Sequence, residues 1–116
     1  MIRRLNLKKY QKVRGMYQKK KYEIIEIDGE EIENDLILRK MFDKAIKLPS
    51  YCGPNMDSVH DCFYDEDWTK KRKFAVLVKN LECLEDYKGI VRIFRDIDIQ
   101  SKRSNFIFEV TIFNEN

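Results

Sequence analysis

The residue types best suited to chemistry gather in one short segment, from Asn55 to Tyr64. If this segment is helical, a rotation of about 100° per residue places Asp57, His60, Asp61 and Tyr64 on the same side. Two carboxylates at positions i and i+4 of a helix repel each other by about 0.2 to 0.5 kcal/mol. This face therefore either lies in water, with Asp57 stabilised by the helix dipole, or binds a positively charged partner.

Catalysis and metal binding fit these residues poorly. His60 is the only histidine, and it lies two residues from Cys62, so the two side chains point to different sides of the helix. Asp57 and Asp61 would occupy a convex helix surface without a partner base. The sequence shows neither the ligand spacing of a metal site nor a glycine-rich phosphate loop. We therefore expect no enzymatic activity, no metal site and no cofactor.

Acidic and aromatic residues continue directly after this segment. Asp65, Glu66 and Asp67 lie between Tyr64 and Trp68. Aromatic side chains are enriched where proteins bind one another, and a merely solvated surface seldom contains them. The whole stretch is thus predicted to contact another protein.

Strands and helices alternate along the part of the chain that would position this stretch. Apolar runs predict strands over 22–27, 73–78 and 105–113. Periodic apolar residues predict a helix that follows an N-cap at Asn34 or Asp35 and stops before Pro49, and further helices over about 55–64 and 85–98. Such alternation indicates a small α/β domain in a three-layer-like arrangement, with a three-stranded parallel sheet packed by helices.

The short helix over 55–64 has a side that suits the core of such a domain. Its buried side would consist of Met56, Val59, Cys62 and Phe63. The acidic side would then face outwards.

The net charge of +3 conceals two parts of opposite charge. Nine of the 23 basic residues and none of the 20 acidic ones lie in residues 1–21, so the rest of the chain has a net charge of −6. We expect a basic N-terminal extension over 1–20 and a domain over 21–116. The extension could be a disordered or solubilising tail, an added strand, or a nucleic-acid-binding arm with Tyr10 and Tyr17 stacking on bases. It could also fold back over Asp57 and Asp61.

The cysteines and the hydropathy suggest where the protein resides. Three cysteines without a CxxC pair suit free thiols in a reducing compartment, and we expect Cys62 and Cys83 to be core or half-buried. No apolar run approaches the ~20 residues of a membrane span. These features predict a cytoplasmic protein without a membrane partner, and we expect a monomer.

The segment Leu48–Phe63, LPSYCGPNMDSVHDCF, resembles the barstar family of ribonuclease inhibitors. The family motif runs LP-x-[YF]-[YC]-G-x-N-x-D-A-[LF]-x-D-x-L, and the chain aligns with it without a gap. The matching residues are Leu48, Pro49, Tyr51, Gly53, Asn55, Asp57 and Asp61. The order of the predicted elements also agrees over about residues 21–113.

The resemblance implies a stoichiometric inhibitor of a basic ribonuclease, of the kind that gives immunity or self-protection against a toxic nuclease. In the family, the loop and the short helix plug the nuclease active site. The implied interface consists of Tyr51, Gly53, Asn55, Asp57, His60 and Asp61, with Tyr64 beside them, Asp96 as a later acid and Trp68 in place of a family tryptophan.

Electrostatics favours the same partner. The cleft of a ribonuclease gathers basic side chains around the scissile phosphate, and a rigid carboxylate placed there replaces the phosphate charge. Asp61 is the best candidate for this role, and Asp57 would meet a second basic group.

Three departures from the family pattern bear on which nuclease is recognised. His60 stands where the family often has tryptophan, Pro54 stiffens the loop, and the segment YDEDW at 64–68 changes the rim. Since histidine gains a proton at about pH 6.5, a charged His60 beside Asp61 would weaken binding towards pH 5.5. The alternative function is a nucleic-acid-associated regulator, in which a barstar-like interaction module has a basic arm over 1–21.

Overall fold

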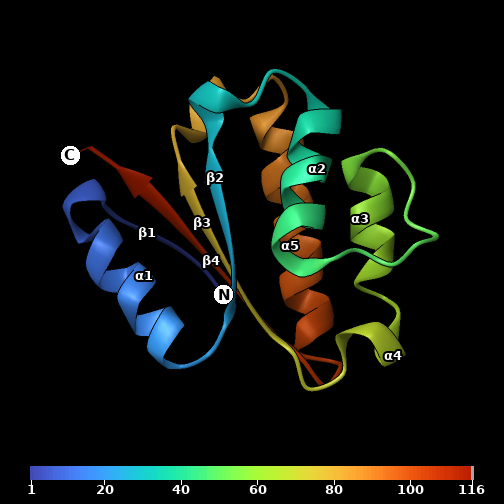
Figure 1. Ribbon diagram of the computed structural model, residues 1–116. Coiled ribbons are helices and arrows are strands. Elements are labelled where there is room, and N and C mark those ends of the chain that lie inside the picture. Colours follow the sequence, from blue (N-terminus) through green and yellow to red (C-terminus); the bar gives the residue numbers. More distant parts are fainter. Residues whose placement is uncertain (116) are drawn as a thin grey trace.

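A parallel sheet of four strands forms the centre of the computed structural model, which describes residues 1–115 (Figure 1). The strand order is β1-β4-β3-β2, with β1 at Ile2–Asn6, β2 at Glu23–Asp28, β3 at Lys73–Lys79 and β4 at Ile107–Asn114. The α-helices are α1 (Tyr10–Lys19), α2 (Asp35–Ile46), α3 (Met56–Cys62), α4 (Glu66–Thr69) and α5 (Tyr87–Ser101). Short 3-10 helices lie at Leu7–Lys9, Gly29–Glu31 and Leu81–Cys83.

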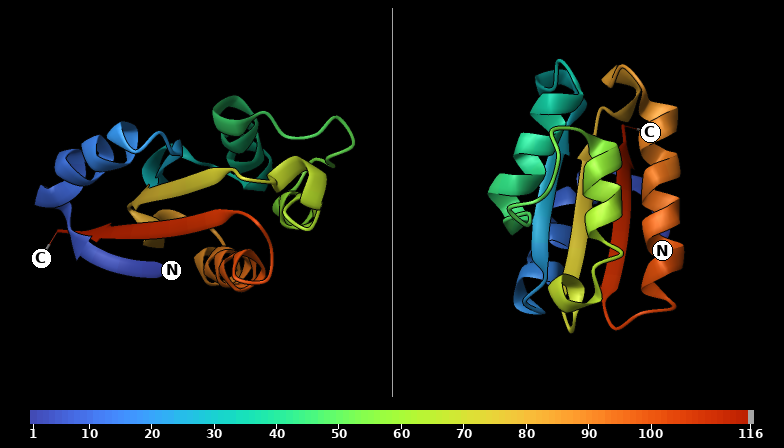
Figure 2. Two further views of the ribbon diagram at one scale, coloured as in Figure 1. Left: turned by 90° about the horizontal axis from the view of Figure 1, so that it is seen from below. Right: turned by 90° about the vertical axis from the view of Figure 1, so that its right-hand side faces the viewer.

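The two faces of the sheet are covered by different helices. Helices α2, α3 and α5 lie on one side and α1 lies on the other (Figures 1 and 2). Because successive side chains of a strand point to opposite faces, β3 contributes Phe74, Val76 and Val78 to the first side and Ala75 and Leu77 to the second. This double burial explains why β3 is an uninterrupted apolar run.

The predicted fold class is confirmed, but the predicted number of strands is wrong. The sheet has a fourth strand, β1, which pairs in parallel with β4 in a register that joins Ile2 to Val110 and Arg4 to Ile112. The arginines of β1 hide its strand character in the sequence. Arg3 is accommodated because its Nε donates to Thr111 Oγ1 at 3.2 Å.

The basic N-terminal segment is therefore folded, and the added strand is the alternative that the structure shows. The helix that follows β1 packs Tyr10, Val13 and Tyr17 against the sheet, next to Leu77 and Phe113. Since α1 and α3 lie on opposite faces of the sheet, this segment does not cover the acidic side of α3.

The other predicted elements correspond to β2, β3, β4, α2, α3 and α5, with shifted ends. The third predicted helix begins at Tyr87, so Gly89 lies in its first turn, where its N–H donates to Asp86 Oδ1 at 3.2 Å.

Cys62 is buried as expected, and burial raises its pKa to about 12. Cys83 is exposed, because it ends a 3-10 helix at the surface, so the prediction of a core or half-buried thiol there is wrong. Within residues 1–115, no helix is both long and apolar enough to cross a membrane.

Candidate protein-binding site

Helix α3 presents the acidic face that its sequence predicts. Met56, Val59 and Cys62 are at most 1% exposed, whereas Asp57 and Asp61 are exposed. The buried side lies in the main core together with Phe63, whose ring packs against the aromatic side chains of β3 and β4. The two carboxylates are thus held on the outside of a helix that its opposite side fixes.

The first turn of α3 is capped from two directions. The Asn55 side-chain oxygen accepts hydrogen bonds from the N–H of Ser58 at 2.9 Å and from its hydroxyl at 3.0 Å. From α2, the carboxylate of Asp35 accepts the N–H of Met56 at 2.9 Å. The position of the helix start is therefore set by its own loop and by a neighbouring helix.

The loop before α3 is held by a single arginine. The guanidinium of Arg39 in α2 donates to the carbonyl oxygens of Cys52 at 3.1 Å and Gly53 at 3.0 Å. Gly53 also lies so close to α3 that a Cβ atom there would be 2.4 Å from Ser58 Oγ. Only glycine allows this approach of the loop to the helix without displacing the serine side chain.

Two tyrosines border the acidic face. Tyr51 and Tyr64 are 63% and 47% exposed, which is unusual for large aromatic side chains. The Tyr51 hydroxyl donates to Asp65, whose carboxylate also caps α4. This hydrogen bond lowers the pKa of Asp65 and raises the pKa of Tyr51 to about 12. The tip of the loop is thereby linked to the segment that follows α3.

His60 faces the neighbouring helix α5. Its Nε2 lies 3.7 Å from an oxygen of Asp96, too far for a hydrogen bond, and among the described residues this buried nitrogen has no hydrogen-bond partner. The ring of Tyr64 packs edge-on against it at 5.3 Å between centroids. His60 is therefore next to Asp96. A positive charge on His60 would act on Asp96 more directly than on Asp61, the residue named in the sequence-based prediction.

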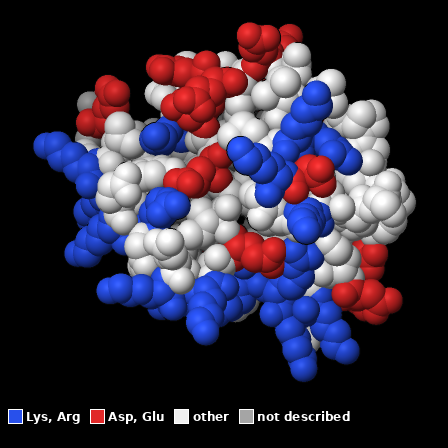
Figure 3. All heavy atoms as spheres, viewed as in Figure 1, with Lys and Arg blue, Asp and Glu red and all other residues white. Residues whose placement is uncertain are grey.

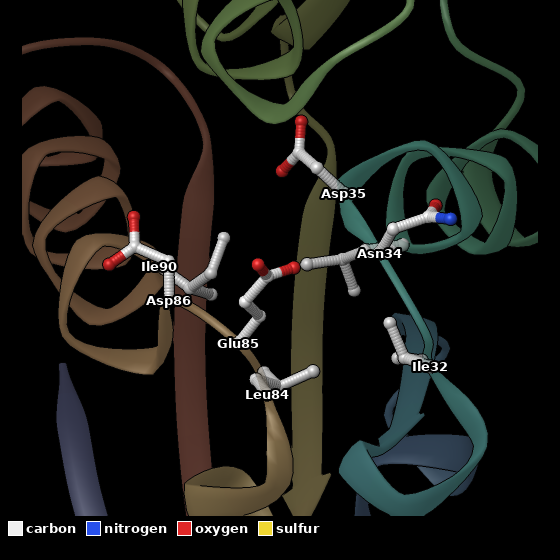
Figure 4. Close-up of a pocket in the computed structure, with 8 residues that line it drawn as sticks. Ile32, Asn34, Asp35, Leu84, Glu85, Asp86 and Ile90 are labelled. Atoms are coloured by element: carbon white, nitrogen blue, oxygen red, sulfur yellow. The ribbon is translucent and has the colours of Figure 1, made fainter.

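A groove runs between α3 and α5. Its lining includes Asp57, His60 and Asp96 from the predicted site, together with Arg92. It adjoins a cavity of about 160 Å³ between the first turns of α2 and α5, which Figure 4 shows. That cavity has an apolar wall and three carboxylates, and its residues are Ile32, Asn34, Asp35, Leu38, Leu84, Glu85, Asp86 and Ile90.

The structure brings eight of the nine predicted residues to one side of the molecule, around α3. They are Tyr51, Gly53, Asn55, Asp57, His60, Asp61, Tyr64 and Asp96. The ninth, Trp68, packs its ring against Phe63 and Phe74, with the Arg72 guanidinium 4.7 Å from the ring centroid. The tryptophan thus contributes mainly to the core.

Sequence reasoning missed the residues that position the site. Asp35 and Arg39 are four residues apart, so they lie on one face of α2, and this spacing was the available signal. Their targets could not be inferred, because these are backbone groups in a distant loop and helix.

Comparison with known proteins agrees with this geometry. A comparison with curated protein sequences found no match. The sequence model of the family described as Barstar (barnase inhibitor) matches residues 22–112, which excludes β1 and α1 and includes every element around α3. Since the match spans well over half of the chain, this protein belongs to the Barstar (barnase inhibitor) family.

Proposed function

We propose that this protein is a stoichiometric inhibitor of a ribonuclease, which it blocks by inserting α3 and the preceding loop into the active site. The observation that supports the proposal most directly is the pair of exposed carboxylates, Asp57 and Asp61, on a helix whose other side is buried. A cytoplasmic inhibitor that acts as a monomer would protect its host from such a nuclease.

In this proposal Asp61 takes the place of the scissile phosphate. A carboxylate accepts charge-assisted hydrogen bonds from the arginine, lysine and histidine side chains that would otherwise bind RNA. Asp57, one helical turn earlier, meets a second basic group, and Asp96 adds a third negative charge across the groove. Tyr51 and Tyr64 would supply apolar contact area at the border.

The hydrogen bonds around α3 favour tight binding because they order the site before the nuclease arrives. Arg39 fixes the loop, and Asn55 and Asp35 fix the helix start. A surface that is ordered in advance loses less conformational entropy on association.

The test compares the wild-type protein with Asp61→Ala and with Glu30→Ala as a matched control. Glu30 is an exposed acid outside the groove, in the 3-10 helix after β2, so its substitution makes the same change in net charge. Each protein serves as bait for cell lysate and culture medium of the source organism, and the retained proteins are assayed for RNA cleavage. The released nuclease is then titrated with each bait.

We expect the wild type and Glu30→Ala to retain a ribonuclease and to abolish its activity at a ratio of one to one. Asp61→Ala should bind at least about 30-fold more weakly, which corresponds to the roughly 2 kcal/mol of an interface hot spot. If all three baits retain the same proteins and none of them suppresses a nuclease, the proposal is wrong.

A further inference from the structure

The outer surface of α1 is a second charged surface, and the nuclease-binding proposal does not use it. Seven of the nine basic residues in the first 21 are exposed, namely Arg4, Lys8, Lys9, Lys12, Lys19, Lys20 and Lys21. Neither α1 nor β1 contains an acidic residue. In Figure 3 basic side chains crowd the left and lower left of the molecule, over α1.

A shallow groove along α1 gives this surface a definite centre. We call it the α1 groove, and it is lined by Gln11, Lys12, Gly15, Met16, Lys19 and Lys20. Lysines stand at both of its ends, about two helical turns apart.

The lysines of the α1 groove have no ionic partner within the described part of the chain. In the N-terminal segment, only Arg14 and the terminal ammonium form salt bridges within 4.0 Å, with Glu26 and Asp98. A polyanion could therefore contact these lysines without displacing an ionic partner.

Gly15 lies on the floor of the groove, where neither crowding nor the backbone conformation requires a glycine. A Cβ atom there would find no other atom within 4 Å, and the residue has no positive φ. Glycine in the middle of a helix costs about 1 kcal/mol relative to alanine. An open floor between lysines is what a closely approaching ligand requires.

The packing of α1 distinguishes between classes of polyanion. Insertion into an anionic membrane needs a free apolar face, but Tyr10, Val13 and Tyr17 are buried against the sheet. The same burial removes the two tyrosines as stacking platforms for bases, so the sequence-based idea of stacking does not hold. Contacts to phosphates remain.

We propose that the α1 groove binds the phosphodiester backbone of a nucleic acid, RNA or DNA, without sequence preference. The α1 groove and the acidic face of α3 lie on opposite sides of the sheet. A bound nucleic acid would therefore leave α3 accessible, and the full chain could hold nucleic acid and a nuclease together. The proposal does not depend on the inhibitor function.

The test uses the full-length protein and fluorescence anisotropy of a labelled 20-nucleotide RNA and of the DNA of the same sequence. The variant Lys12→Gln/Lys19→Gln/Lys20→Gln removes three charges from the groove and retains good helix formers. The control Lys40→Gln/Lys44→Gln/Lys102→Gln removes three exposed lysines from α2 and the end of α5. Gly15→Gln keeps the charge and fills the floor of the groove.

We expect the wild type to bind both strands with micromolar affinity at 50 mM salt, and binding should weaken steeply as salt increases. The groove variant should bind at least about tenfold more weakly, and its slope of log K against log salt should fall by about 2, since each lost contact to a single strand removes about 0.7. The nucleic-acid affinity of the control variant should stay within about twofold of the wild-type affinity. Gly15→Gln should weaken binding about threefold or more while circular dichroism shows α1 intact.

Four outcomes would overturn the proposal. One is an equal loss in both triple variants, which would indicate a dependence on net charge alone. Another is a dissociation constant above about 100 µM for the wild-type protein at 50 mM salt. The third is equally tight binding to phosphatidylserine vesicles, which would favour a membrane surface. The fourth is binding to only one of RNA and DNA, which would indicate that the groove recognises the sugar and not the phosphate backbone that the two share.

Discussion

The two faces of the sheet have opposite charges and are built differently. On one face, the acids of α3 lie over the large core. Their loop accepts hydrogen bonds from Arg39, and their helix donates backbone N–H groups to the side chains of Asn55 and Asp35. On the other face, the exposed bases lie on α1 and at its two ends, and α1 rests on a small cluster around Tyr10 and Tyr17. The family model matches residues 22–112, which include the helices of the first face, whereas α1 on the second face lies outside the match.

The difference teaches that one sheet can support two charged surfaces that are packed independently of each other. The side chains of β3 alternate between the two clusters, so each helix layer is packed against its own set of residues. A change within one cluster should therefore affect the surface above it more than the surface on the opposite side.

The largest effect is expected from Tyr17→Ala, which tests whether the two faces are independent by disrupting the cluster beneath α1. Tyr17 is 2% exposed and packs against Tyr22 at 4.8 Å between ring centroids. Removing a large buried aromatic side chain costs about 3–5 kcal/mol in free energy of unfolding. We expect a loss of that size in urea denaturation, with detachment of α1 and loss of binding by the α1 groove.

The nuclease affinity of the folded Tyr17→Ala protein should stay within about twofold of the wild type, since additivity holds for distant sites. Leu5→Ala is a milder variant of the same cluster, because that side chain is only partly buried. A large fall in nuclease affinity in both variants, at temperatures where they are folded, would contradict the independence of the two faces.

The same packing makes deletion of residues 1–21 an unsuitable test of the nucleic-acid alternative. The deletion would expose Ala75, Leu77 and Phe113 and the open edge of β4, which pairs with β1. Any loss of function could then come from instability or aggregation. Substitutions of exposed lysines avoid this difficulty.

A smaller effect is expected from Arg39→Met, which tests whether the acidic face must be ordered in advance. Methionine keeps part of the apolar stem and removes the donors to the Cys52 and Gly53 carbonyls. We expect the loop to become mobile and the nuclease to dissociate about tenfold faster, a change of about 1.4 kcal/mol.

Lys40→Met is the matched control for this prediction, because Lys40 is the next residue of α2 and is exposed. Dissociation rates from surface plasmon resonance, measured with the captured nuclease, provide the comparison. Equal rates for the two variants would show that the loop does not need Arg39 to bind.

Where the sequence contains a local periodic signal, its predictions agree with the structure. The apolar spacing in α3 separates Met56 and Val59 from Asp57 and Asp61, and both sides lie as expected. The sequence of α1 contains such a signal too, in Tyr10, Val13 and Tyr17 at helical spacing, but the surrounding lysines hide it.

The remaining features depend on how distant segments pack, and no local pattern encodes that. Strand β1 is short, contains two arginines, and becomes a strand because β4 offers it a free edge. In the same way, His60 meets Asp96 only because α5 lies beside α3. The family motif supplies Asp57 and Asp61, but it does not reveal which residues hold them in place.

The smallest expected effect concerns pH, and it sharpens the comparison because only the acidic face contains a histidine. A positive charge on the His60 imidazole would lie 3.7 Å from Asp96, in a groove that also contains Asp57 and Arg92. That charge offsets one carboxylate, so a basic nuclease should bind more weakly at the lower pH.

We expect a loss of about threefold in affinity between pH 7.5 and 5.5, or roughly 0.7 kcal/mol, beyond any change due to the nuclease itself. His60→Gln separates the two contributions, because glutamine stays neutral over this range while the titration of the nuclease is unchanged. The ratio of wild-type to His60→Gln affinity, measured by calorimetry at both pH values, should therefore fall on acidification. A constant ratio would show that His60 stays neutral or that its charge does not reach the interface. The α1 groove contains no histidine, so its affinity for nucleic acid should be the same at both pH values.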